Sequence, residues 1–160
     1  MVSWWQFFFT INTIKPKGGI MEDLTINEQK FNYSPLTERE EFIGKLVIRS
    51  AFKVHQTLGP GLLEKVYEIC LTHEIIKAGL NVRRQVDLPI SYDGITFDEG
   101  LRLDLLVDEK VVCELKAVDQ VNPVWEAQIL SHLKLTGLRL GFLINFNVAL
   151  IKQGIRRFIV

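Results

Sequence analysis

The chain has 160 residues, of which 48% are hydrophobic and 24% are charged, a globular balance that excludes a disordered or fibrous protein. This length accommodates one α/β core and is too short for two domains of ordinary size. Nineteen basic and nineteen acidic residues give a formal net charge of zero, so any contact with nucleic acid requires a local basic patch. Nine basic residues are candidates for such a patch, although an evenly solvated surface explains most of them better: Lys53, Arg83, Arg84, Arg102, Lys134, Arg139, Lys152, Arg156 and Arg157.

Residues 1–20 differ from the rest of the chain. They begin with an aromatic run and end in a Lys-Pro-Lys-Gly-Gly breaker, after which Met21 opens an ordinary acidic segment. The apolar run is short for a membrane helix, which needs about 20 residues, and it lacks the basic start and cleavage site of a signal peptide. We expect a disordered or non-native extension over 1–20, an N-terminal arm over 21–36 and a single domain over 37–160. A membrane-surface anchor is the alternative for the first segment.

Two helices are expected first. The stretch 37–40, Thr-Glu-Arg-Glu, has the capping-box pattern, and apolar residues follow it at helical spacing as far as Leu58. Gly59-Pro60-Gly61 ends this helix, and the pattern predicts a second helix from Leu62 to Ala78, closed by Gly79.

One face of the second helix combines a carboxylate with apolar residues. Glu64, Tyr67, Leu71 and Ile75 recur at helical spacing and therefore share one side. An acidic residue on an inward-packing face is unusual. The plainer explanation is that Glu64 lies at the edge of the apolar stripe.

Alternating patterns predict three strands next, over Val82–Tyr92, Ile95–Val107 and Lys110–Val118. Asp93-Gly94 turns the first into the second, and Gly100 marks a bulge.

A third helix and a buried strand follow. Asn122 caps a helix that has Pro123 at its first position and continues to Thr136. Leu140–Asn147 is nearly all apolar, as in a strand buried on both faces. The order α-α-β-β-β-α-β predicts an α/β fold in which an antiparallel meander is extended by a parallel crossover strand. Residues after Ala149 add either one more helix or an edge strand.

The stretch Leu101–Ala117 carries the most chemistry. Alternation places Leu101, Leu103, Leu105 and Val107 on one face with Asp104 on the other, and it places Glu114 and Lys116 on one face. If Val107 pairs with Val111 across the turn at 108–110, Asp104 lies opposite Glu114, with Cβ atoms roughly 4.5–5.5 Å apart.

Like charges so placed are destabilising, and a cation between them relieves the repulsion. Hard oxygen ligands suit magnesium or manganese. A solvated hairpin with scattered charges explains the pattern about equally well. In this register Arg102 lies across from Lys116, where it either meets a phosphate or forms a salt bridge to Asp104 or Glu114.

The sequence contains no zinc-site pattern. Cys70 and Cys113 each fall at an apolar position, which is typical of buried free thiols in a reducing cytosol. The histidines at positions 55, 73 and 132 stand far apart, and we expect them to be helix-surface or helix-packing residues.

The set formed by Asp104 and then Glu114-Leu115-Lys116 resembles the PD-(D/E)XK nuclease superfamily, with Leu103 in place of the leading Pro. A more specific resemblance lies in 61–67, Gly-Leu-Leu-Glu-Lys-Val-Tyr, which reads as the motif that names the GxxExxY family of small proteins in that superfamily. The similarity extends from about Ile43 to the C-terminus, through the segments 84–86, 103–107, 114–118, 126–128, 143–147 and 154–157.

This resemblance implies a restriction-endonuclease-like core, a central mixed sheet flanked by helices. It also implies a nuclease dependent on Mg²⁺ or Mn²⁺ that acts on nucleic acid, with DNA expected. Asp104, Glu114 and the backbone carbonyl of Leu115 would hold the metal, and Lys116 would assist the attacking water. Glu64 would hold a metal-bound water or a second metal, and Gln128 would contact substrate or water.

Two other functions fit the same sequence. The first is a nucleic-acid- or protein-binding accessory domain that keeps the fold and the carboxylates without turnover. The second is a structural oligomer subunit whose carboxylates are paired to Arg102 and Lys116. For the nuclease we expect a cytoplasmic protein without membrane association, and a homodimer is a further expectation for an enzyme of this size.

Overall fold

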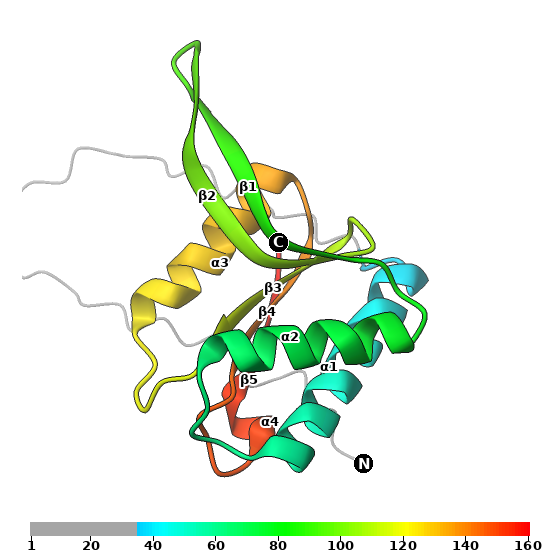
Figure 1. The fold of residues 1–160 in the computed structure, drawn as a ribbon. Helices are drawn as coiled ribbons and strands as arrows, with labels where there is room; N and C mark the ends of the chain where they lie inside the picture. Colours follow the sequence, from blue (N-terminus) through cyan, green and yellow to red (C-terminus); the bar gives the residue numbers. More distant parts are fainter. Residues whose placement is uncertain (1–34) are drawn as a thin grey trace, which may run out of the picture. The chain divides into compact units, whose positions relative to one another are not determined.

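The computed structural model describes residues 35–160, apart from the side chains of Asp98 and Glu99, so the expectations for the segment before residue 35 lie outside the described residues. Figure 1 shows the described elements, which are α1 (Glu38–Leu58), α2 (Glu64–Lys77), β1 (Val82–Tyr92), β2 (Ile95–Val107), β3 (Val111–Lys116), α3 (Pro123–Thr136), β4 (Leu140–Asn145), α4 (Ile151–Gly154) and β5 (Ile155–Ile159). None of the helices in this part of the chain is long and apolar enough to cross a bilayer.

The five strands form one mixed sheet in the order β1-β2-β3-β4-β5. Antiparallel pairing joins β1 to β2, β2 to β3 and β4 to β5, whereas β4 runs parallel to β3. Parallel neighbours need a crossover connection, and α3 provides it. The predicted α/β fold is confirmed. The C-terminal segment forms both the short helix and the edge strand that were alternatives.

Helices cover both faces of the sheet (Figure 1). On one face, α1 and α2 pack around Tyr67 against strand residues that include Leu105 and Phe142. On the other face, Ile129 and Leu133 of α3 pack in a second cluster. This second layer lies close to the sheet, because a Cβ on Gly141 of β4 would lie 3.1 Å from Ile129.

Local capping explains most of the helix ends. The predicted capping box is confirmed, since the Glu40 amide donates to the Thr37 hydroxyl and the Thr37 amide donates to the Glu40 carboxylate. The predicted start of α2 at Leu62 is wrong by two residues, because Leu63 is extended (φ −65°, ψ 143°). Glu64 is therefore the first residue of α2.

The long β1–β2 hairpin contains an irregularity where it projects from the sheet (Figure 1). The pairing register shifts between Leu88 and Ile90, and Gly100 lies across from this point. A Cβ on Gly100 would lie 1.9 Å from the carbonyl oxygen of Leu88, which only glycine avoids. The predicted bulge at Gly100 is confirmed.

The prediction that Leu101, Leu103, Leu105 and Val107 share one face of β2 is wrong. Leu105 and Val107 pack in the cluster under α1 and α2, but Leu103 packs in the cluster under α3. The change of side falls at Asp104, whose neighbour on β1 is Gln85, and Gln85 has a left-handed backbone (φ 50°). Strict alternation therefore does not continue through Asp104.

Tyr67 closes the loop between α1 and α2. Its hydroxyl donates to the Gly59 carbonyl at 2.7 Å and accepts from the Leu62 amide at 3.1 Å. Its ring stacks on Phe146 with centroids 4.6 Å apart. This side chain fixes the entry to α2 and thereby the position of Glu64.

Replacing Tyr67 with Phe keeps the stacked ring and removes both hydrogen bonds. We expect the free energy of unfolding to fall by about 1–3 kcal/mol, because the Leu62 amide and the Gly59 carbonyl lose a partner. Urea unfolding measures this loss. Tyr92→Phe on the hairpin, where Tyr92 is 71% exposed, is the matched control and should change little. Equal stability of the two variants would contradict the role of the Tyr67 hydroxyl.

Candidate functional site

The candidate site lies where β2 and β3 stop pairing. Val107 pairs with Val111, the register on which the expected pairing of Asp104 with Glu114 depended, but the regular ladder ends at Leu105 and Cys113, so Asp104 and Glu114 do not form a ladder pair. One residue further, the Asp104 carboxylate accepts a hydrogen bond from the Leu115 amide at 2.8 Å. The acidic side chain thus takes the place of a backbone partner and ties β2 to β3.

Glu114 is buried in this corner, so a solvated hairpin is the wrong description of the stretch. The residue is 2% exposed, and its Oε1 accepts from Lys116 Nζ at 2.6 Å. Lys116 follows two residues later on the same face of β3, which explains why the two side chains meet. The Lys116 ammonium also lies 5.7 Å from the centroid of the Trp125 ring on α3.

We call the region around Glu64, Asp104, Glu114 and Lys116 the acidic corner. Its electrostatics disfavour ionisation of Glu114. Burial raises the pKa of Glu114 to about 7, and the negative charges of Asp104 and Glu64 add to this effect, while Lys116 opposes it. The Oε2 atom of Glu114 is buried without a hydrogen-bond partner within the described residues. Glu114 therefore carries more negative charge and more acceptor capacity than its neighbours satisfy.

Glu64 approaches the same corner from the first turn of α2. The residue as a whole is exposed, yet desolvation raises the pKa of its carboxyl group, and Asp104 and Glu68 raise it further. Lys116 and the backbone amide of Ala117 act in the opposite direction. Three acidic side chains from three different elements therefore influence one another around a single lysine.

Gln128 lies on the side of α3 that faces β3. It is one turn after Trp125 and one turn before His132, and residues at this spacing share a face of a helix. Both neighbours reach the site, since Trp125 covers Lys116 and His132 Nδ1 lies 3.6 Å from Glu114 Oε2. The structure thus brings Glu64, Asp104, Glu114 and Lys116 to one region of the fold, and helical spacing relates Gln128 to this region without a direct contact to it.

Two further residues join this region that the sequence did not single out. Glu68 is buried and accepts from Arg84 at 2.7 Å and from Gln85 at 3.0 Å, and Lys65 contacts it as well. The Gln85 amide also donates to Asp104 at 3.3 Å, so it bridges the two acids. Burial alone would raise the pKa of Glu68, but Lys65 and Arg84 lower it overall. The sequence signal that could have indicated Gln85 was the segment 84–86, which is one of the segments that resemble the GxxExxY family.

The expected position of Arg102 across from Lys116 and its expected salt bridge to Asp104 or Glu114 are both wrong, and its contact with a phosphate stays a prediction. It pairs across the hairpin with Asp87, and its Nε lies 2.7 Å from Asp87 Oδ1. The β2–β3 ladder ends before Arg102, so it does not lie across from Lys116. Of the nine predicted basic candidates, the following six form ion pairs: Lys53, Arg83, Arg84, Arg102, Arg156 and Arg157.

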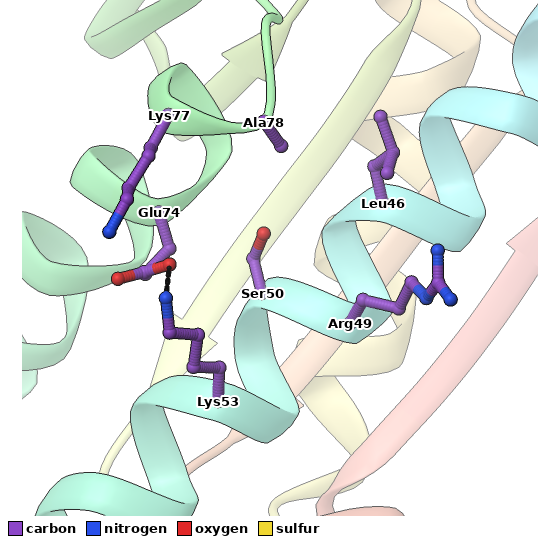
Figure 2. Close-up of a pocket in the computed structure, with 7 residues that line it drawn as sticks. All are labelled: Leu46, Arg49, Ser50, Lys53, Glu74, Lys77 and Ala78. Atoms are coloured by element: carbon purple, nitrogen blue, oxygen red, sulfur yellow. Dashed lines mark hydrogen bonds and ion pairs between the residues drawn. The ribbon is translucent and has the colours of Figure 1, made fainter.

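A separate groove of about 250 Å³ lies between α1 and α2 (Figure 2). Lys53 Nζ donates to Glu74 at 2.6 Å across it. Arg49 and Lys77 also line the groove, and neither forms an ion pair within the described residues. The groove does not include any of the predicted site residues, and its lining is Leu46, Arg49, Ser50, Lys53, Glu74, Lys77 and Ala78.

The cysteines and histidines agree only partly with expectation. Both cysteines are free, and Cys113 is buried, but Cys70 is only half-buried. His55 is a packing residue whose Nε2 donates to the Val148 carbonyl at 2.8 Å. His132 is fully buried on α3, against Glu114.

Carboxylate groups of Glu64, Asp104 and Glu114 influence one another in this corner, and carboxylate oxygens are ligands that hard divalent cations prefer. One of these oxygens, Oε2 of Glu114, is buried without a hydrogen-bond partner within the described residues, and burial is the main cause of the raised pKa of Glu114. Among residues 35–160, no three His, Cys, Asp or Glu side chains form a group that could hold a metal ion.

Comparison with known families gives one match. A model described as the PD-(D/E)XK nuclease superfamily matches residues 41–158, which include every residue of the acidic corner. No curated protein and no solved structure matches the chain.

The raised pKa of Glu114 predicts how stability depends on pH in metal-free buffer. A raised pKa means that the folded state favours the protonated acid, so this stabilisation is present below about pH 4.5 and is lost as the pH rises through about 7. We expect the free energy of unfolding of the wild type to fall by on the order of 2 kcal/mol between pH 5 and 8. Glu114→Gln should not show this fall. Urea unfolding of both proteins with a chelator measures it. Parallel pH profiles for the two proteins would contradict the assignment.

Proposed function

Because the chain belongs to the PD-(D/E)XK nuclease superfamily, we propose that it is a metal-dependent nuclease that hydrolyses phosphodiester bonds of DNA. The observation that carries this proposal is the buried Glu114 carboxylate, held by Lys116 and repelled by Asp104. Phosphoryl transfer requires such a cluster to neutralise charge and to activate water.

The proposed roles follow from the donor chemistry of each residue. Asp104, Glu114 and the Leu115 carbonyl would hold Mg²⁺ or Mn²⁺, which supplies Lewis-acid stabilisation of the phosphoryl oxygens. Lys116 would orient the attacking water and stabilise negative charge in the transition state.

Two other residues complete the proposed site. Glu64 would hold a metal-bound water or serve a second metal, and Gln128 would contact substrate or water. The contact of Lys116 with both Glu114 and Trp125 supports its role, because a positioned ammonium needs no reorganisation when charge develops.

The basic side chains around the α1–α2 groove are candidates for contacts with nucleic-acid phosphates. Arg49 and Lys77 form no ion pair within the described residues, whereas most of the predicted basic candidates are neutralised by a carboxylate. A protein with zero net charge must rely on such local charge. We further propose that the chain is a GxxExxY-type member of the superfamily, that it acts as a homodimer, and that its free thiols reflect a reducing cytoplasm.

The second candidate is an accessory domain that binds nucleic acid or protein without cleaving it. Two observations favour it, namely the ion pairing of most basic candidates and the exposure of Glu64. Such a domain would bind DNA to the same extent with magnesium and with a chelator, and would leave the DNA intact with either metal.

Cleavage assays on the full chain test the nuclease directly. Linear, supercoiled and single-stranded DNA, and RNA, are incubated with Mg²⁺, Mn²⁺ or a chelator, and products are resolved on gels. We expect metal-dependent cleavage that falls at least about 100-fold in Glu114→Gln, Asp104→Asn and Lys116→Met.

Glu109→Gln is the matched control, because Glu109 lies in the adjacent turn with a 62% exposed side chain. It should cleave like the wild type. Cleavage that survives both Glu114→Gln and Lys116→Met would overturn the assigned site. Binding without cleavage in either metal would favour the accessory domain.

A further inference from the structure

Three polar atoms meet in the interface between α3 and β3 without a hydrogen-bond partner. They are Oε2 of Glu114 and both ring nitrogens of His132, all of them buried. His132 is 0% exposed, and its Nδ1 lies 3.6 Å from Glu114 Oε2. Buried polar groups in native proteins are nearly always paired, so a cluster of three unpaired atoms calls for a physical explanation.

The other buried histidine behaves in the usual way. His55 is also buried, and its Nε2 donates to the Val148 carbonyl at 2.8 Å. The fold therefore satisfies a buried imidazole where that imidazole has only a packing role. The unpaired nitrogens of His132 are a property of the acidic corner.

Tautomer choice decides which of the three atoms can be satisfied. With the proton on Nδ1, the ring donates to Glu114 Oε2, and a small shortening of the 3.6 Å separation satisfies two of the three atoms. With the proton on Nε2, the Nδ1 lone pair faces an ionised carboxylate oxygen and none of the three is satisfied. Burial lowers the pKa of His132, which favours a neutral ring that has one donor and one acceptor.

We propose that His132 is a positioning residue that donates its Nδ1–H to Oε2 of Glu114 and holds this carboxylate in the orientation that binds the divalent cation. The cation itself rests on the proposed function. Lys116 Nζ already holds Oε1 at 2.6 Å from the other side, so His132 completes a clamp on the carboxylate. Hydrogen-bonded partners of metal-ligating carboxylates typically change metal affinity by 10–100-fold.

Because His132 stands on α3, its hydrogen bond also links the crossover helix to the site. Trp125 of the same helix covers Lys116, so one face of α3 contacts both residues of the Glu114–Lys116 pair. Any displacement of α3 along the sheet would disturb both contacts together. The positioning role therefore depends on the packing of Ile129 and Leu133 beneath α3.

Nuclear magnetic resonance of the full chain labelled with ¹⁵N tests the tautomer without any metal. At pH 8.5, above the pKa of about 7 of Glu114, we expect the His132 ring to be protonated on Nδ1 and to stay so when Mg²⁺ is added. A ring protonated on Nε2 would overturn the proposal. A ring whose Nδ1 is deprotonated and binds the added Mg²⁺ directly would overturn it as well.

Calorimetric titration of Mg²⁺ and Mn²⁺ into full-length variants gives the second readout. His132→Leu should weaken binding 10–100-fold. His132→Asn, whose amide can place a donor near the Nδ1 position, should recover most of the affinity. His55→Leu controls for the loss of a buried histidine and should lower stability while the metal affinity stays unchanged. Circular dichroism checks that each variant is folded.

The outcomes separate this inference from the proposed function. Wild-type affinity in a folded His132→Leu variant would overturn the positioning role and leave the nuclease proposal intact. If the wild type binds neither metal, the proposed function fails. In that case the tautomer measured without metal still decides whether His132 holds Glu114.

Discussion

The structure around β3 depends on one constraint, the burial of the Glu114 carboxyl group close to that of Asp104. An ionised carboxylate removed from water is costly unless it is paired and hydrogen-bonded. Glu114 has one cationic partner, Lys116, and this partner is available only because side chains two residues apart on a strand point to the same face. The strand therefore supplies the most direct compensation, and the surrounding elements supply the rest.

These elements converge on the corner because the sheet fixes their positions. The turn after β2 places Asp108 and Glu109 in left-handed backbone conformations, which sets the pairing of Val107 with Val111. Slipping that register by one residue would move Glu114 to the opposite face of β3, into the apolar cluster under α1 and α2. The parallel arrangement of β3 and β4 then requires a crossover, and the crossover helix is the one that brings Trp125 and His132 to the site.

Sequence patterns predicted the parts of the site that depend on local rules. The turn, the register at Val107, the capping box and the asparagine cap of α3 all follow from residue type and spacing. Alternation failed at Leu103, which packs in the cluster under α3, and no pattern in β2 itself reveals this change of side. The predicted partner of Arg102 was wrong because it depends on where the β2–β3 ladder ends, which the pattern of β2 does not show either.

Sequence spacing could not predict which side chains meet through tertiary packing. Glu68 lies beside Tyr67 of the quoted motif, yet only the fold shows that Arg84 and Gln85 approach it from β1. His132 sits at an ordinary position of an amphipathic helix, and its burial against Glu114 depends on how α3 crosses the sheet. A long-range contact of this kind leaves no local signature.

The charge balance of the corner bears on the structural alternative. A purely structural subunit would need Arg102 and Lys116 together to neutralise Asp104 and Glu114, but Arg102 is paired with Asp87 on the hairpin. Lys116 is then the basic residue that remains near Asp104, Glu114 and Glu64, and the hydrogen-bond partners of Asp104 are the neutral Leu115 amide and Gln85. With Glu64, Glu68, Asp104 and Glu114 ionised, four negative charges face the positive charges of Lys65, Arg84 and Lys116, so one negative charge remains uncompensated. A bound cation would offset this charge, which is the physical argument for testing the corner for metal binding.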